Sequence, residues 1–176
     1  LLRYISGTLD LGIAFTRSRS LQDLIAYSDA DWAGDLDDRR STTGYVLLLA
    51  GGPVSWKSVR QKSVAISTTE SEYMALSETA QEVIWIRRLL KSLGENMEAP
   101  TTVFEDNLSA IGLVKNSRFH SRTKHIGIRY HFTRELVDSG DIKVLHCSTD
   151  QMLADTLTKS LSKDQFIYLR NKIGVI

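Results

Sequence analysis

Several residue types and patterns are scarce in this sequence of 176 residues, and each scarcity narrows what the protein can be. Its single cysteine, Cys147, excludes a disulfide within the chain. No apolar run approaches the roughly 20 residues that span a bilayer. The start, residues 1–4, has neither an initiator methionine nor a signal-peptide pattern. We therefore expect an intracellular fragment of a longer protein that folds as one domain with a substantial core.

A large net charge is also absent, since the formal charge is +1 at pH 7, but the charges are unevenly distributed. Residues 21–38 contain six acidic side chains and no lysine or arginine, whereas residues 111–134 contain six basic side chains, three histidines and no acid. An acidic cluster can hold cations and a basic segment can hold phosphates, as a metal-dependent nuclease requires. Solvated faces that merely differ in sign would leave the same pattern.

Hydrophobic periodicity and turn residues predict an α/β fold with a five-stranded mixed sheet. The first three strands form an antiparallel meander over residues 24–28, 43–49 and 54–66. Two later strands, 102–105 and 142–146, alternate with helices, an order that gives parallel strands in a sheet flanked by helices. Besides one long helix, shorter helices are expected at 108–114, at 129–137 and from residue 151 onward.

The long helix follows the meander and contains a carboxylate with an unusual orientation. Ser67 and Glu70 form a capping-box pattern, and the helix is expected to continue to about Leu93. At about 100° per residue, Glu70 faces solvent, whereas Glu72 heads the core-facing stripe. The other members of that stripe are Leu76, Thr79, Val83, Ile86 and Leu90. A carboxylate that faces the sheet needs a compensating positive group, which a metal ion or a nearby lysine or arginine would supply.

Three aspartates follow predicted strands, where functional groups of open α/β sheets gather. Asp29 follows the first strand, Asp106 the fourth, and Asp155 lies after the fifth, near the last helix. With Glu72 they would offer hard oxygen ligands to two divalent ions, one activating a water and the other stabilising the leaving oxygen of a phosphodiester. Each aspartate also has a structural interpretation, as a turn residue, an N-cap or a first-turn acid.

Two other kinds of chemistry have weaker patterns. Cys147 beside His146 would suit a thiol nucleophile, but nothing in the sequence places a second histidine and an orienting amide beside it. His120, His125 and His131 would suit zinc, yet spacings of five and six residues fit no common pair on one helical face.

Four segments resemble the ribonuclease H domain of copia-type retrotransposon polyproteins. They read YSDADWAGD at 27–35, STTESEYMAL at 67–76, EDN at 105–107 and LADTLTK at 153–159. Segments 40–45 and 122–126 also match, so the resemblance covers nearly the whole chain. Residues 2–8 resemble the end of a reverse transcriptase. The resemblance thus implies two parts, the tail of a preceding reverse transcriptase or connection region at 1–20 and a ribonuclease H-like domain at 21–176.

This resemblance implies an endoribonuclease that cuts RNA in RNA–DNA hybrids. It would use two magnesium ions, with manganese as an alternative, beside the upstream reverse transcriptase domain of the same polyprotein. The implied metal ligands are Asp29, Glu72, Asp106 and Asp155. His146 would assist the attack or product release. The implied location is the cytoplasm, within a virus-like particle, or the nucleus.

The first ligand position departs from the wider ribonuclease H pattern. Ala30 stands where a glycine commonly follows the first aspartate, and Asp31 lies two residues after Asp29. Both carboxylates would share one face of a continuing strand, so Asp31 competes with Asp29, which the pattern favours.

Contacts to the hybrid backbone are expected from five residues: Arg40, Ser41, Arg122, Lys124 and Arg129. A plain turn or a solvated basic helix would also account for these residues. Two other functions stay open. One is an inactive nucleic-acid-binding module, against which the four intact acids argue. The other is an integrase-like transferase, which uses three acids and lacks the element from His146 to Asp155.

Overall fold

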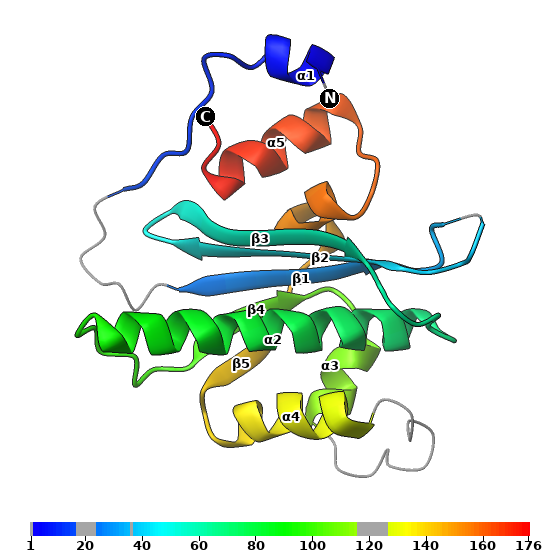
Figure 1. Cartoon of the computed structure of the whole chain (residues 1–176), viewed down its shortest axis with the longest axis vertical. Helices are drawn as coiled ribbons and strands as arrows, with labels where there is room; N and C mark the ends of the chain where they lie inside the picture. The colour runs from blue at the N-terminus through cyan, green and yellow to red at the C-terminus, as the bar shows by residue number, and fades with distance from the viewer. Residues whose placement is uncertain (1, 17–23, 36, 116–126) are drawn as a thin grey trace.

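The computed structural model describes residues 2–16, 24–35, 37–115 and 127–176. One five-stranded mixed sheet runs through it, in the order β3-β2-β1-β4-β5 (Figure 1). The strands are β1 (Ile25–Asp31), β2 (Thr42–Leu49), β3 (Gly52–Arg60), β4 (Thr101–Glu105) and β5 (Ile142–His146). β1, β2 and β3 form the antiparallel meander, and β4 and β5 extend it in parallel with β1. The predicted fold class is confirmed.

Two strands end three or more residues away from the position that the sequence predicts. β1 continues through the first acids to Asp31, because residues 29–31 pair with residues 42–44 of β2. β3 ends at Arg60, where its pairing with β2 ends, so residues 61–66 form a connection to the long helix. Asp29 therefore lies within a strand rather than at its end.

The helices cover both faces of the sheet. α2 (Thr68–Ser92), α3 (Leu108–Lys115) and α4 (Gly127–Asp138) lie on one face, and α5 (Lys163–Ile173) lies on the other with α1 (Leu2–Ser6) beside it (Figure 1). Two 3-10 turns precede α5, namely η3 (Thr149–Gln151) and η4 (Leu153–Leu157). No helix among the described residues is both long and apolar enough to span a bilayer.

A hydrophobic core lies on each face of the sheet, and alternate side chains of β2 pack into one or the other. Leu47 packs into the larger core with residues of α2 and α4, such as Val83 and Tyr130. Val46 and Leu48 point to the other face and pack with residues of η4 and α5. The sheet is therefore buried on both faces, and side chains from either face can reach its edges.

The start of α2 confirms one prediction and corrects another. Ser67 Oγ accepts a hydrogen bond from Glu70 N at 3.1 Å, as expected of an N-cap. Glu70, however, is buried rather than solvent-facing, because its carboxylate turns back to accept a hydrogen bond from Ile66 N at 2.8 Å. Glu72 and its stripe, from Leu76 to Leu90, are buried as predicted.

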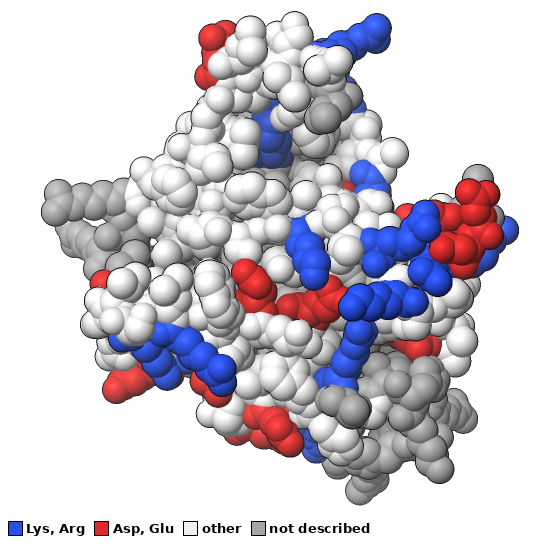
Figure 2. Space-filling view, in the orientation of Figure 1, with Lys and Arg blue, Asp and Glu red and all other residues white. Residues whose placement is uncertain are grey.

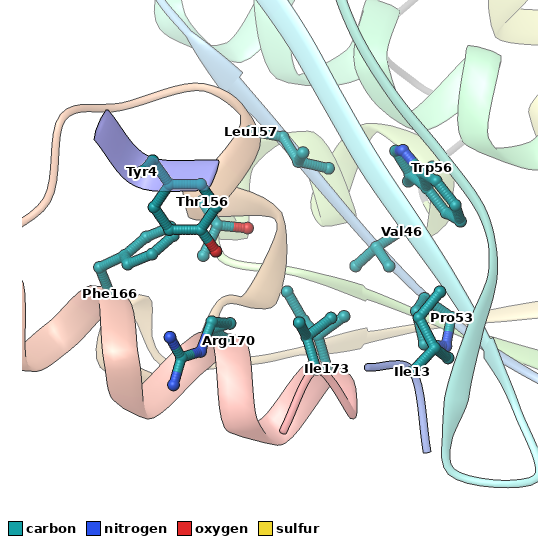
Figure 3. Close-up of a pocket in the computed structure, with 11 residues that line it drawn as sticks. Tyr4, Ile13, Val46, Pro53, Trp56, Thr156, Leu157, Phe166, Arg170 and Ile173 are labelled. Atoms are coloured by element: carbon teal, nitrogen blue, oxygen red, sulfur yellow. The ribbon is translucent and has the colours of Figure 1, made fainter. Parts of the chain in front are cut away.

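The two ends of the chain lie side by side above the sheet (Figure 1). Gly12 N and Ile176 O are 2.8 Å apart, Ala14 N and Gly174 O are also 2.8 Å apart, and Thr16 N donates to Ala50 O. A mostly apolar cavity of about 630 Å³ lies between this end and the sheet, with lining residues from α1, β2, η4 and α5 (Figure 3). The division of the chain at residue 20 stays a prediction.

Candidate metal-binding active site

Three carboxylates converge at the carboxyl ends of β1 and β4. Asp29 lies in β1, Asp106 follows β4 directly, and Glu72 lies in the first turns of α2. One oxygen of each lies within 4.8 Å of the others. β1 and β4 are parallel neighbours, so their carboxyl ends meet at one edge. The hydrogen bond from Ala30 N to Glu72 Oε2, at 2.7 Å, fixes α2 against the same edge.

Asp155 reaches this edge from the opposite face of the sheet. It lies in η4 and is buried, but it is not part of the three-carboxylate group found among the described residues. Lys159 connects it to Asp29, with Nζ 2.9 Å from an oxygen of each carboxylate. Thr158 Oγ1 donates to the other oxygen of Asp29.

A glycine in β2 lets η4 approach Asp29 so closely. Gly44 pairs with Asp29 across the β1–β2 ladder. A Cβ at Gly44 would lie 2.5 Å from Thr158 Cγ2 and 3.1 Å from Ala154 O. The segment from Asp155 to Lys159 can therefore contact Asp29 only because residue 44 is a glycine.

The carboxylates repel one another in a buried setting. Burial, followed by the negative charges of Asp29 and Asp106, raises the pKa of Glu72 to about 9. Burial and Asp29 raise the pKa of Asp155 to about 6, although Lys159 opposes the shift. A divalent cation would relieve this repulsion, and carboxylate oxygens are the donors that Mg²⁺ and Mn²⁺ prefer. The donor set therefore fits such an ion.

Glu105 is a second buried glutamate that the sequence reasoning missed. It is the last residue of β4, has no exposed surface and does not join the three-carboxylate group. Its Oε1 accepts a hydrogen bond from Asn107 N at 3.2 Å, and its Oε2 has no hydrogen-bond partner among the described residues. Burial, then the charge of Glu72, raises its pKa well above the ordinary value. The EDN segment contains two adjacent acids, Glu105 and Asp106. Only the tertiary contacts show that Asp106 joins the cluster and Glu105 does not.

The structure brings Asp29 rather than Asp31 into the cluster. Asp31 is half-buried at the end of β1, outside the three-carboxylate group. Burial and the neighbouring charge of Asp29 raise its pKa. The geometry thus favours Asp29 as the ligand from this strand.

His146 and Cys147 lie at the end of β5. His146 is exposed and pairs in register with Glu105, one residue before Asp106. Cys147 is half-buried, and burial followed by the charge of Asp106 raises the pKa of its thiol. A raised pKa disfavours the thiolate, which argues against a thiol nucleophile.

The residues expected to contact nucleic acid differ in their surroundings and in their exposure to solvent. Arg40 is paired with Asp38 at 3.3 Å in the loop after β1. Ser41 is fully buried, and its Oγ accepts a hydrogen bond from Ala33 N, so any influence on a bound strand would pass through this loop. Arg122 and Lys124 lie outside the described residues, as do His120 and His125 of the zinc alternative.

Arg129 lies in α4 and lines a groove of about 480 Å³ whose other cationic residues are Lys57 and Lys62. Acidic residues of α2, Glu78 and Glu82, line the same groove. Figure 2 shows acidic and basic side chains gathered together at the end of the molecule where the loop after β1 projects.

Comparison with known proteins identifies the relatives of the chain. No family model matches it. It is 49% identical over 175 residues to the retrovirus-related Pol polyprotein from transposon RE2 of Arabidopsis thaliana. That match covers 99% of this chain and 12% of the relative, so the chain spans about an eighth of the length of this much larger protein.

Solved structures agree in fold at low identity. The N-terminal RNase H domain of rv2228c from Mycobacterium tuberculosis superposes with a TM-score of 0.57 at 11% identity, covering 84% of this chain and 96% of that one. LC11-RNase H1 in complex with an RNA/DNA hybrid gives 0.56 at 12% identity, covering 77% of this chain and 93% of that one. The chain is therefore similar over 99% of its length to a segment of a retrovirus-related Pol polyprotein, and it has the ribonuclease H-like fold.

Proposed function

We propose that this chain is an endoribonuclease that hydrolyses the RNA strand of RNA–DNA hybrids with the aid of divalent metal ions. The observation that carries the proposal is the convergence of Asp29, Glu72 and Asp106 within 4.8 Å at the carboxyl ends of β1 and β4. A solved neighbour of this fold is described as a complex with an RNA/DNA hybrid, which supports the choice of substrate.

The metal would be magnesium or manganese, held by these three carboxylates and, for a second ion, by Asp29 and Asp155. When bound, the ions would lower the pKa of the attacking water and neutralise charge on the scissile phosphate. The hydrogen bond from Ala30 N orients Glu72, and Thr149 Oγ1 donates to Asp106 Oδ2 at 2.9 Å. These donors hold the carboxylates in place before the substrate arrives.

His146 is proposed to exchange a proton near the reacting phosphate. It lies at the end of β5, beside the strand that leads to Asp106, and its exposure leaves it open to substrate. An imidazole nitrogen can either accept or donate a proton, as this role requires.

The hybrid would be recognised mainly through its backbone shape and 2′-hydroxyls, with little sequence preference. Arg40, Arg122, Lys124 and Arg129 are proposed to contact phosphates, with Ser41 supporting the loop that carries Arg40. In a longer polyprotein, the upstream reverse transcriptase domain would deliver the hybrid, and the enzyme would remove the RNA template in the cytoplasm.

The proposal is tested with purified chain, Mg²⁺ and an end-labelled RNA–DNA hybrid. Asp106→Asn removes one ligand charge at nearly constant volume, so we expect a loss of at least about a hundredfold in cleavage rate. Asp138→Asn, an exposed acid at the end of α4, is the matched control and should cleave as the parent does.

Cleavage by Asp106→Asn at the parent rate would show that the assigned centre is wrong. Hybrid binding without cleavage by the parent would favour the inactive binding module. Joining or cutting of duplex DNA instead would favour the integrase-like transferase. Single-stranded RNA and duplex DNA of the same sequence therefore accompany the hybrid as substrates.

A further inference from the structure

Lys159 places its ammonium between carboxylates from two elements that are far apart in sequence. Its Nζ lies 2.9 Å from Asp29 Oδ1 and 2.9 Å from Asp155 Oδ1. The side chain of Asp29 has no exposed surface and that of Asp155 is 4% exposed, whereas that of Lys159 is 33% exposed. Buried carboxylates need a compensating charge, and Lys159 supplies it from a partly open position.

Asp29 is shared between two groupings of acids. On one side it joins Glu72 and Asp106, in the three-carboxylate group. On the other side it joins Asp155 through the ammonium of Lys159. The carboxylates therefore divide into a three-acid subsite (Asp29, Glu72 and Asp106) and a two-acid subsite (Asp29 and Asp155).

We propose that the Lys159 ammonium is the resident cation of the two-acid subsite, so that a divalent ion enters this subsite only by displacing it. In the three-acid subsite, the ion pairs of the described residues join Lys159 to Asp29 alone and not to Glu72 or Asp106, so a divalent ion there meets less competition. This inference rests on the proposed metal-dependent function and assigns unequal affinities to its two metal positions.

The chemistry of lysine suits this exchange. An ammonium is a compact charge with three donors on a flexible four-carbon stem, so it can satisfy two carboxylates and still move away along its exposed side. Thr158 Oγ1 holds the other oxygen of Asp29 and keeps the carboxylate in place when the ammonium leaves. Lys159 thus acts as a positioning residue that sets the metal dependence of the centre.

The test counts bound ions without nucleic acid. The full chain, stripped with EDTA and dialysed, is titrated with Mn²⁺ while the electron paramagnetic resonance signal of free Mn²⁺ is followed. We expect one tighter and one weaker site in the parent. Lys159→Met removes the competing charge at similar length, so its weaker site should tighten by about tenfold or more. Lys159→Arg keeps the charge and should retain the parent's unequal sites.

The controls separate a local exchange from a general effect. Lys163→Met changes an exposed lysine at the start of α5 and should bind Mn²⁺ as the parent does. Asp155→Asn should abolish the weaker site and leave the tighter one within about twofold. If Lys159→Met fails to fold, as circular dichroism would reveal, Asp155→Asn still tests the proposal.

An unchanged weaker site in folded Lys159→Met would overturn the proposal, and so would loss of the tighter site in Asp155→Asn. Because these titrations contain no hybrid, a parent that shows the expected ion binding but cuts no hybrid would refute the proposed nuclease activity alone.

Discussion

Glu72 and Glu105 are both buried near the same edge of the sheet, yet their surroundings give them different roles. Glu72 is hydrogen-bonded by Ala30 N and offers an oxygen to the cluster with Asp29 and Asp106. Glu105 lies outside that cluster, and within the described part of the chain one of its oxygens has no hydrogen-bond partner. The raised pKa of Glu105, caused first by burial, favours its neutral form.

We predict that Glu105→Gln preserves both stability and activity. An amide has nearly the shape of a neutral carboxylic acid and can still accept the hydrogen bond from Asn107 N, so the free energy of unfolding should change by less than about 1 kcal/mol. Glu72→Gln, the matched variant, should lose at least about a hundredfold in hybrid cleavage. Urea unfolding and the cleavage assay measure the two effects. Equal losses of activity in both variants would contradict the distinction.

At the scale of the elements, the site depends on how closely η4 packs on the meander. η4 lies across the sheet from α2 and brings Asp155, Thr158 and Lys159 to Asp29. Gly44 in β2 leaves the space for it, since any side chain there would meet Thr158 and the backbone of Ala154. The packing of one 3-10 turn thus completes the arrangement of acids.

We therefore predict that Gly44→Ala lowers the free energy of unfolding by about 1–3 kcal/mol, as overpacking does. It should also weaken metal-dependent cleavage, because η4 must shift away from Asp29. Gly112→Ala, in the middle of α3, is the control: its Cβ would meet no atom of the described residues within 4 Å, and alanine favours a helix over glycine by up to about 1 kcal/mol. A Gly44→Ala variant as stable and active as the parent would refute this account of η4.

For the whole molecule, the acid cluster predicts how stability varies with pH. The pKa of Glu72 is about 9 and that of Asp155 about 6, both above their ordinary values. The folded state therefore holds protons more tightly than the unfolded state, and it loses this advantage as pH rises through these values. In EDTA, the free energy of unfolding should fall between pH 5 and pH 9, with a slope on the order of 1 kcal/mol per pH unit where one proton differs.

Saturating Mg²⁺ should flatten this slope, because a bound cation stabilises the ionised carboxylates that otherwise repel one another. Urea titrations at matched ionic strength, with EDTA or with Mg²⁺, provide the comparison. The same slope under both conditions would mean that the cluster does not bind the metal.

The pairing of the chain ends yields a second prediction for the whole molecule. Residues 12–16 hydrogen-bond with the last residues and with Ala50, and a Cβ on Gly52 would lie 2.7 Å from the ring of Phe15. Deleting residues 1–16 should lower the free energy of unfolding by about 2 kcal/mol, through lost hydrogen bonds and apolar contact. Unchanged stability in urea would instead support residues 1–20 as an independent tail.

Local periodicity in the sequence was sufficient to predict the five strands, the long helix and the orientation of Glu72. The period of a helix or strand depends on neighbouring residues, so it can be read without knowledge of the fold. The same reasoning placed Glu70 in solvent, because a helical angle does not show that a side chain turns back onto the preceding loop. Ser41, expected to contact the hybrid backbone, is buried instead, and its Oγ accepts a hydrogen bond from Ala33 N.

The sequence by itself determined the fold class and the set of acids that surround the site, through patterns of adjacent residues and a resemblance to copia-type polyproteins. Only the tertiary structure decided how those acids are grouped. Lys159 meets Asp29 across 130 residues of sequence, and Glu105 is kept out of the cluster while Asp155 arrives from the opposite face. Such contacts depend on which strands become neighbours and which turn packs on them, and this information is not contained in any local pattern.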